Sequence, residues 1–429
     1  MSRSSNKVKN AWAMYDWANS VYSLVITSTI FPIYYSAISS GDGSDKVSLF
    51  GFEFINSALY SFAISFVFLV TAAIAPILSG VADYGGYKKR FMQFFCYLGG
   101  FACISLFLFD SKELLGFGLA CFVIAGIGYS GSIVFYNSFL PIIAEKREHD
   151  KLSAKGYALG YVGSSLLLIF SLTMVLMPDL YGIADDSMAP RISFVLTGIW
   201  WIGFAQITFA HLPKEHGTAE IKHHIITNGY KELRKVWIEL KTNKVLKNYL
   251  LGFFFFTMGV QTVMYVATLF GDKELQLESS QLIITILIIQ FVAIGGAYLF
   301  AWLSSRFGNI MALLVAVFIW IGICVAAYFV YSAMEFYALA FVVGMVMGGI
   351  QSLSRSTYSK MLPETVDHAS YFAFYDVGEK IAIVIGTASY GLINELTGGM
   401  RPSIFVLAAF FIVGVFLLLK QYRLSPLKD

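Results

Sequence analysis

The chain contains 429 residues, of which 57% are hydrophobic and only 13% are charged, whereas charged residues make up roughly 25% of an average soluble domain. This composition indicates a membrane protein. The formal net charge is +3 and no basic tract alternates with aromatic residues, so the sequence excludes a nucleic-acid-binding protein. The four cysteines lie inside apolar runs without the spacing of metal ligands, and we expect neither a metal site nor a cofactor.

Twelve apolar stretches are long enough to cross a bilayer, which takes about 20 residues in a helix. They cover residues 14–38, 54–82, 91–109, 114–142, 155–177, 191–212, 248–270, 280–304, 309–331, 335–362, 370–393 and 402–420. We therefore predict an all-α membrane protein with twelve transmembrane helices in two six-helix bundles. The N-terminal bundle comprises residues 1–211, a cytoplasmic linker with an amphipathic helix comprises 212–247, and the C-terminal bundle comprises 248–429.

The first stretch, AWAMYDWANSVYSLVITSTIFPIYYS (residues 11–36), carries a polar face. Its members are Asp16, Asn19, Ser20, Ser23 and Thr27, at spacings of 0, 3, 4, 7 and 11 residues, which places them on one side of an α-helix. A carboxylate in the middle of a spanning helix costs about 2.5–3.5 kcal/mol, so this side is expected to line a polar interior. Alternatively, Asp16 lies at the level of the lipid headgroups and only caps the helix.

The loop after the second stretch reads SGVADYGGYKKRF (residues 79–91). Asp83 falls at the end of a predicted helix and faces a turn at Gly86, which Lys88, Lys89 and Arg90 follow. A carboxylate there can contact the terminus of a neighbouring helix and hold the cytoplasmic side shut. Alternatively, the basic residues only fix the topology, and Asp83 is their solvated counterion.

The linker shows the pattern of an amphipathic helix. Apolar residues recur at steps of three and four, namely Ile226, Tyr230, Leu233, Trp237 and Leu240, with Lys231, Arg234 and Lys235 between them. This pattern predicts a helix that lies on the inner leaflet of the membrane. A helix that binds a partner protein is the alternative.

The stretch YFAFYDVGEKIAIVIGTASYG (residues 371–391) is the most highly charged of the predicted spans, with Asp376, Glu379 and Lys380 on one face. A pair of Asp376 and Lys380 four residues apart can serve insertion alone. However, Arg355 near the inner end of the preceding span adds a second cation. Two cations and two carboxylates suit a small zwitterion or anion, and ionisable residues within a membrane are candidates for function.

Two sequence matches share an offset of 222 residues, which is close to half the chain. SGVADYGGYKKRF aligns with AWLSSRFGNIMAL, so that Gly86 matches Gly308, and YNSFLP (136–141) aligns with YSKMLP (358–363). Two parallel, pseudo-symmetric halves are the architecture that this repeat predicts, and transporters built from such halves bind substrate between them.

The distribution of lysine and arginine predicts the orientation, because positively charged loops stay in the cytoplasm. With the N-terminus inside, the cytoplasmic segments hold 24 of these 30 residues and the opposite side holds 5, while Lys380 lies within a span. Both termini are therefore expected in the cytoplasm.

Several motifs resemble those of a known family. SGVADYGGYKKRF is similar to the loop between helices 2 and 3 of the major facilitator superfamily, with Ser79 in place of that motif's first glycine. The motifs YDWANSVYSLVITSTIFPIYY, VADYGG, FYNSFLP, QSLSRS and YDVGEK together resemble the vacuole-effluxer-like branch, which is related to the autophagy-associated amino-acid exporter of fungal vacuoles. The resemblance covers nearly the whole chain, implies the two-bundle fold and a place in the bacterial inner membrane, and is uninformative about the substrate.

The resemblance and the polar faces together predict a secondary active transporter that moves a small polar solute by alternating access. An amino acid or a related zwitterion or anion is the expected substrate, with efflux as the direction and proton coupling, and we expect a monomer whose only partners are the substrate and the bilayer. Asp376 or Glu379 is expected to accept the proton, and Lys380 with Arg355 to hold a substrate carboxylate. The predicted pathway comprises Asp16, Asn19, Ser23, Thr27, Tyr136, Asn137, Gln351, Arg355, Tyr375, Asp376, Glu379 and Lys380, and the predicted gate comprises Asp83, Gly86, Lys88, Lys89 and Arg90.

Two other classes of protein are alternatives. A membrane-embedded enzyme acting on a lipid would need an acid, a nucleophile or a metal cluster, and the sequence contains no HExxH, DDxxD, GxSxG or P-loop motif, so we expect no enzyme. A membrane receptor or scaffold that uses the central linker is the second alternative, and deletion of residues 215–245 would abolish its function.

Overall fold

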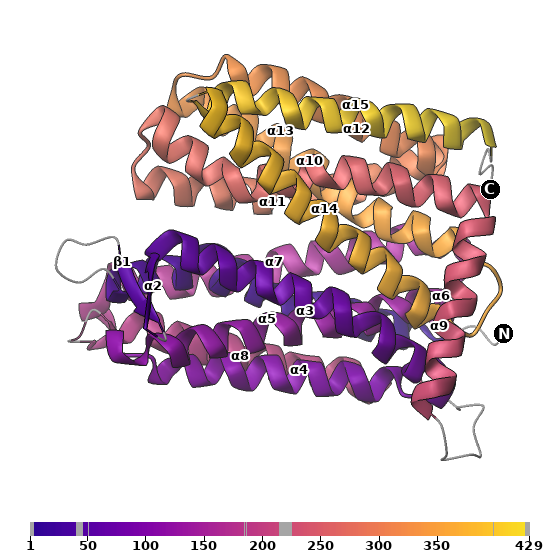
Figure 1. Cartoon of the computed structure of the whole chain (residues 1–429), viewed down its shortest axis with the longest axis horizontal. Helices are drawn as coiled ribbons and strands as arrows, with labels where there is room; N and C mark the ends of the chain where they lie inside the picture. The colour runs from indigo at the N-terminus through magenta and orange to yellow at the C-terminus, as the bar shows by residue number, and fades with distance from the viewer. Residues whose placement is uncertain are drawn as a thin grey trace.

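The computed structural model describes residues 4–39, 46–49, 51–183, 185, 187–213, 225–397 and 399–424. The predicted all-α class is confirmed, and the described residues form twelve long helical crossings (Figure 1). The first crossing consists of α1 (Asn6–Val21), the π-helical segment η1 (Tyr22–Ile30) and α2 (Phe31–Ser39). The others are α3 (Asn56–Gly85), α4 (Lys88–Ser105), α5 (Leu115–Ser138), α7 (His149–Leu176), α8 (Met188–His211), α10 (Lys244–Leu275), α11 (Ser279–Phe307), α12 (Asn309–Tyr328), α13 (Ala333–Met361), α14 (His368–Thr397) and α15 (Met400–Leu424).

Short elements join the crossings. A two-stranded antiparallel hairpin, β1 (Lys46–Leu49) and β2 (Phe52–Ile55), pairs Lys46 with Ile55 and lies between α2 and α3. The remaining pieces are η2 (Leu106–Leu108), η3 (Lys112–Leu114), α6 (Leu140–Ile143), η4 (Lys146–Glu148), η5 (Pro178–Tyr181) and α9 (Ile225–Thr242). The hairpin was not predicted, because a strand of four residues leaves too short an alternating pattern in the sequence.

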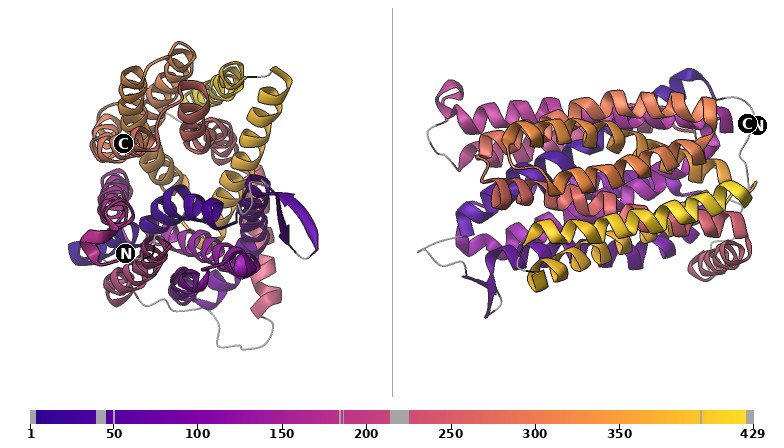
Figure 2. Two further views of the ribbon diagram at one scale, coloured as in Figure 1. Left: turned by 90° about the vertical axis from the view of Figure 1, so that its left-hand side faces the viewer. Right: turned by 90° about the horizontal axis from the view of Figure 1, so that it is seen from above.

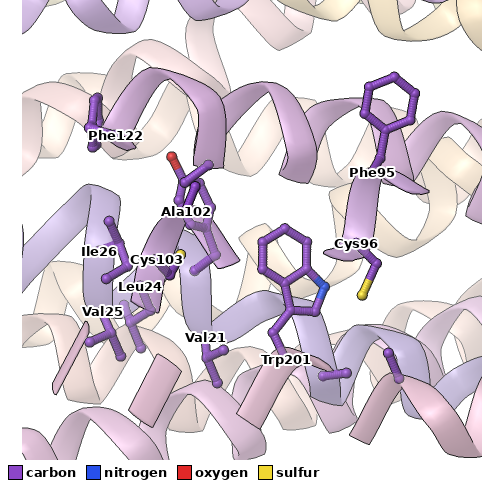
Figure 3. Packing of buried hydrophobic residues seen from close by; sticks show 14 of the residues in the cluster. Val21, Leu24, Val25, Ile26, Phe95, Cys96, Ala102, Cys103, Phe122 and Trp201 are labelled. Atoms are coloured by element: carbon purple, nitrogen blue, oxygen red, sulfur yellow. The ribbon is translucent and has the colours of Figure 1, made fainter. Parts of the chain in front are cut away.

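The crossings form two bundles, α1–α8 and α10–α15, that lie side by side (Figures 1 and 2). Each bundle has its own apolar core. In the first bundle Trp201 projects from α8 toward α4, the helix that carries Cys96 and Cys103 (Figure 3), and its indole lies against Gly99, where any side chain would collide. The repeat found in the sequence recurs in the backbone, since Gly86 and Gly308 both turn the chain with a positive φ, of 68° and 83°.

Eleven of the twelve crossings are long enough and apolar enough to span a membrane by composition. The twelfth, α14, has the length, at 30 residues, but carries Asp376, Glu379 and Lys380. A helix that exposed these charges to lipid would be costly. The fold instead places α14 against α3 and α5 of the other bundle as well as α10 and α15 of its own.

The polar face predicted for the first crossing assumes a regular α-helix, and that assumption is wrong beyond Val21. Residues Tyr22–Ile30 form a π-helix, in which the hydroxyl of Ser28 donates to the carbonyl of Ser23, five residues earlier. A π-turn holds more residues than an α-turn, so Thr27 is rotated relative to the α-helical wheel. Asp16 and Asn19 precede the π-segment and keep the predicted relation to each other.

Twelve crossings return the chain to the end at which it starts, so α1 begins and α15 ends at one end of the molecule, called here the terminal end (Figure 1). The helix α9 lies at this end and runs across the long axis of the bundles. The β-hairpin marks the opposite end, called here the hairpin end.

The linker helix predicted from the sequence is present as α9. One side of this helix packs against the two bundles, and another side is exposed. Val236 and Leu240 are buried in the core of the second bundle, and Gly229 lies against α3, where a Cβ would come within 2.8 Å of the backbone nitrogen of Val81. Tyr230 and Trp237 remain 63% and 47% exposed. The side chain of Ile226 and residues 214–224 lie outside the described part of the chain.

Candidate functional site

The predicted gate residue Asp83 joins the two bundles at the terminal end. Its carboxylate accepts hydrogen bonds from the backbone N–H groups of Ala369 and Ser370, at 3.1 and 2.7 Å. These groups belong to the first turn of α14, where backbone donors have no partner within the helix and the helix dipole favours a negative charge. Lys88 completes the contact, 3.1 Å from Asp83, and donates to the carbonyl of Val366.

The contacts described for the other predicted gate residues lie within the first bundle or at its end. Gly86 ends α3 with a φ of 68°, a conformation that favours glycine. Lys89 donates to the carbonyl of Leu212 after α8, and the guanidinium of Arg90 lies 5.3 Å from the ring centre of Tyr87. Within this set, Asp83 and Lys88 therefore contact the second bundle.

A second buried polar cluster at the terminal end was not predicted. Asp150 at the start of α7 accepts from Lys360 of α13 at 2.8 Å, and both side chains are less than 10% exposed. Ser304 and Asn309, which flank the turn between α11 and α12, donate to the same carboxylate at 2.8 Å each. The sequence signal for this cluster is Lys360, a charged residue inside the repeated YSKMLP motif.

The linker helix α9 adds a third contact between the bundles at this end. While its Gly229 lies against α3, its Lys235 donates to Asp367, the residue before α14, at 3.0 Å. This hydrogen bond raises the pKa of Lys235. Opening of the terminal end by separating α3 from α14 would therefore require α9 to release one of the two bundles.

Closer to the middle of the molecule, Asp16 of α1 pairs with Arg355 of α13. One guanidinium nitrogen lies 3.0 Å from the carboxylate, and the two side chains are 10% and 3% exposed. The hydroxyl of Tyr136 donates to the same carboxylate at 2.8 Å, and Ser153 accepts from Arg355 through its hydroxyl, at 2.9 Å, and its carbonyl. Asn137 offers its carbonyl oxygen to Arg355 at 3.4 Å. Asp16 is therefore the partner of an arginine from the other bundle, not a helix cap.

Aromatic rings enclose the Arg355 guanidinium. Those of Trp12, Tyr136 and Tyr157 lie with their centres 4.9, 5.4 and 4.2 Å from it, within the range of cation–π attraction. Gly156 of α7 lies against the Asp16–Arg355 pair. Glycine is required there, because a Cβ would lie 2.9 Å from the guanidinium and collide with the Asp16 carboxylate.

The charged residues of α14 form a separate cluster. Lys380 lies 3.2 Å from Asp376 and 3.8 Å from Glu379, and Gln261 of α10 donates to Glu379 at 2.7 Å. Asp376 is almost fully buried, at 4% side-chain exposure, and apart from its ion pair with Lys380 neither carboxylate oxygen has a hydrogen-bond partner among the described residues. Glu379 is the most accessible of the three charged side chains, at 24% exposure.

The expected partnership of Arg355 with Lys380 is not present in this structure, because Arg355 is committed to Asp16 and Ser153. The two clusters are nevertheless neighbours. Tyr129 of α5 and Tyr157 of α7 lie near Asp16 as well as near Glu379 and Lys380. Lys380 lies twelve residues into α14, about 18 Å from its start, which is close to the middle of a hydrocarbon core about 30 Å thick.

The remaining residues of the predicted pathway occupy varied positions. Gln351 accepts from Tyr161 at 2.7 Å and so connects α13 to α7. Tyr375 packs in the core of the second bundle, 4.1 Å from Phe253 between ring centres. Asn19 is 1% exposed, whereas Ser23 and Thr27 are partly exposed.

Comparisons with known proteins agree with this arrangement. The family model described as "Vacuole effluxer Atg22 like" matches residues 4–423. The chain is 31% identical to "Uncharacterized MFS-type transporter YxiO" of Bacillus subtilis, over 97% of this chain and 95% of that protein. It is 24% identical to "Autophagy-related protein 22-1" of Penicillium rubens, over 90% and 79% of the two chains.

Solved structures show the same fold. The E. coli fucose:proton symporter FucP superposes with a TM-score of 0.69 at 15% identity, covering 97% of this chain and 98% of that chain. The proton:xylose symporter XylE superposes with a TM-score of 0.70 at 12% identity, over 97% and 95% of the two chains. Both similarities concern the fold alone.

Proposed function

Because this chain belongs to the Atg22-like vacuole-effluxer family of major facilitator transporters, we propose that it exports a small amino acid or related zwitterion in exchange for protons. That the protein is a secondary transporter and not an enzyme follows from the family. The solute, the direction and the coupling ion are the proposal. The name of the family, an effluxer, supports the direction.

The charged cluster of α14 carries this proposal. Asp376, Glu379 and Lys380 project from a membrane-spanning helix, where charges are retained only at a high free-energy cost. Asp376 is buried against Lys380, while Glu379 is accessible and held by an amide that can stay bonded when the carboxylate is protonated. Glu379 is therefore the proton acceptor that we propose.

The same cluster favours recognition of an amino group. Two carboxylates face a single lysine, so the α14 cluster has a surplus of one negative charge when both acids are ionised. The second cation expected from the sequence, Arg355, is neutralised by Asp16. We propose that Glu379 binds the ammonium group of the solute when it has no proton, and that Lys380 contacts the solute carboxylate.

Closure of the terminal end supports a cycle of alternating access. Three contacts cross between the bundles there, from Asp83 to α14, from Asp150 to Lys360 and from α9 to Asp367. The charge distribution along the sequence predicts that this end lies in the cytoplasm. In the proposed cycle the structure is the form closed to the cytoplasm, and these contacts break when the solute is loaded from the inside.

Transport in proteoliposomes tests the proposal. Vesicles loaded with a labelled amino-acid panel are assayed for counterflow and for accumulation driven by a proton gradient. Glu379→Gln should lose proton-driven accumulation and lower counterflow, because the amide cannot titrate and, like the protonated acid, carries no negative charge for the ammonium group. Glu278→Gln, an exposed acid outside the cluster, is the matched control and should behave as the parent. Proton-driven accumulation by Glu379→Gln at the parent level would contradict the proposed role of Glu379.

A further inference from the structure

The orientation of α9 about its own axis is determined by its two contacts with the α14 region. Lys235 binds Asp367, immediately before α14, whereas Trp237 stacks on Phe374 with ring centres 5.4 Å apart. Phe374 lies seven residues further along, about 10 Å deeper in the bundle. Because Lys235 and Trp237 are two residues apart, they point to nearly opposite sides of α9. The Trp237 side of α9 therefore faces the interior of the membrane, and the Lys235 side faces away from it.

The side of α9 that faces the membrane combines aromatic and basic residues. Tyr230, Arg234, Trp237 and Lys241 recur at spacings of four, three and four residues and are all exposed. The ammonium group of Lys241 lies 4.7 Å from the ring centre of Trp237. Within the described part of the chain, neither Arg234 nor Lys241 makes an ion pair. The acidic residues Glu232 and Glu239 lie on the other side of the helix, with Lys235.

This distribution matches the headgroup region of a bilayer. Tryptophan and tyrosine concentrate where lipid meets water, and cations beside them attract anionic headgroups. The position of α9 also places its exposed aromatic rings beside lipid, since it runs across the membrane axis at the terminal end (Figure 1) and is followed directly by the spanning helix α10.

We propose that Arg234 and Lys241, with Tyr230 and Trp237, form a binding site for the phosphate of an anionic phospholipid. The site faces the inner leaflet, an assignment that rests on the proposed topology. The proposed lipid site depends on neither the identity of the solute nor the direction of transport. The helix that carries the site is the one that connects α3 to Asp367 at the closed terminal end.

Quenching of Trp237 by brominated lipid tests the proposal in the full-length protein. The chain is reconstituted in phosphatidylcholine vesicles that contain either dibromo-phosphatidylglycerol or the same fraction of dibromo-phosphatidylcholine. The fluorescence of Trp237 is obtained by subtracting the signal of Trp237→Phe. We expect phosphatidylglycerol to quench this component at lower fractions than phosphatidylcholine. Since one basic residue near the surface contributes about 1 kcal/mol, Arg234→Gln and Lys241→Gln should each weaken this preference by about fivefold.

Lys231→Gln is the matched control, because it removes the same charge from an exposed position on the same helix but outside the proposed site. It should leave the preference unchanged. Equal quenching by the two lipids, or an equal loss of preference in Lys231→Gln, would overturn the proposal.

Spin labels test the orientation separately. All four native cysteines are buried, so a label reacts selectively at Tyr230→Cys or Lys231→Cys. The label at position 230 should be relaxed by oxygen, which concentrates in lipid, and the label at 231 by a water-soluble nickel complex. The same water accessibility at both positions would show that the Tyr230 side does not face lipid and would also overturn the proposal.

Discussion

Removal of the Asp16 charge should open the terminal end of the protein. Asp16→Asn keeps the shape of the side chain and leaves an acceptor for Tyr136, but it deprives the buried Arg355 of its counterion. The two residues belong to different bundles. When the terminal end opens, they separate and Arg355 gains access to water, so the cost of the substitution falls on the closed form.

The size of the effect follows from burial. Removing one partner of a buried ion pair costs about 3–5 kcal/mol, and these side chains are only 10% and 3% exposed. Since about 1.4 kcal/mol corresponds to a factor of ten, the ratio of open to closed forms should rise at least about 100-fold. Replacing both residues, as in Asp16→Asn with Arg355→Met, removes the uncompensated charge and should reverse most of this rise.

A cysteine at position 373 reports the opening. Ala373 of α14 is completely buried against Ala75 of α3 and Val134 of α5, so Ala373→Cys reacts with maleimide only when the bundles separate. We expect the rate of modification in nanodiscs to rise about 100-fold with Asp16→Asn. Asp110→Asn is the matched control, because it removes a half-exposed partner of Arg191 within the first bundle. An unchanged rate with Asp16→Asn, or the same rise with Asp110→Asn, would refute the reasoning.

Three further predictions concern the gate, the packing and the topology. Asp83→Asn should raise the rate of modification of Ala373→Cys by about fivefold, because a charge at a helix N-terminus contributes about 1 kcal/mol; no change would argue against the gate. Gly156→Ala should lower the free energy of unfolding by about 1–3 kcal/mol, because the added Cβ collides with the Asp16–Arg355 pair. Thermal denaturation measures this loss. Gly203→Ala should not lower the free energy of unfolding, since a Cβ at that position has no atom within 4 Å. A phosphatase fused after Asp429 should stay inactive while one inserted in the hairpin is active; the reverse pattern would invert the proposed topology.

Features that depend on neighbouring residues in the chain could be predicted from the sequence. The length of each apolar run predicts a spanning helix, because an isolated backbone in lipid must satisfy its own hydrogen bonds. The four-residue spacing of Asp376 and Lys380 predicts their contact, and the acid–turn–base pattern around Gly86 predicts a helix-end contact for Asp83. The family resemblance rested on such local motifs.

Tertiary structure alone decided which groups meet across the bundles. Arg355 lies 339 residues from Asp16, and helical periodicity gives the face on which each side chain lies but not the helix that packs there. The same holds for Asp150, which stands in the first turn of α7 and is buried because Ser304, Asn309 and Lys360 converge on it. The π-helix in the first crossing rotates Thr27 away from the predicted face. A buried charge needs a partner wherever the packing provides one, so the identity of that partner is a property of the assembled bundles.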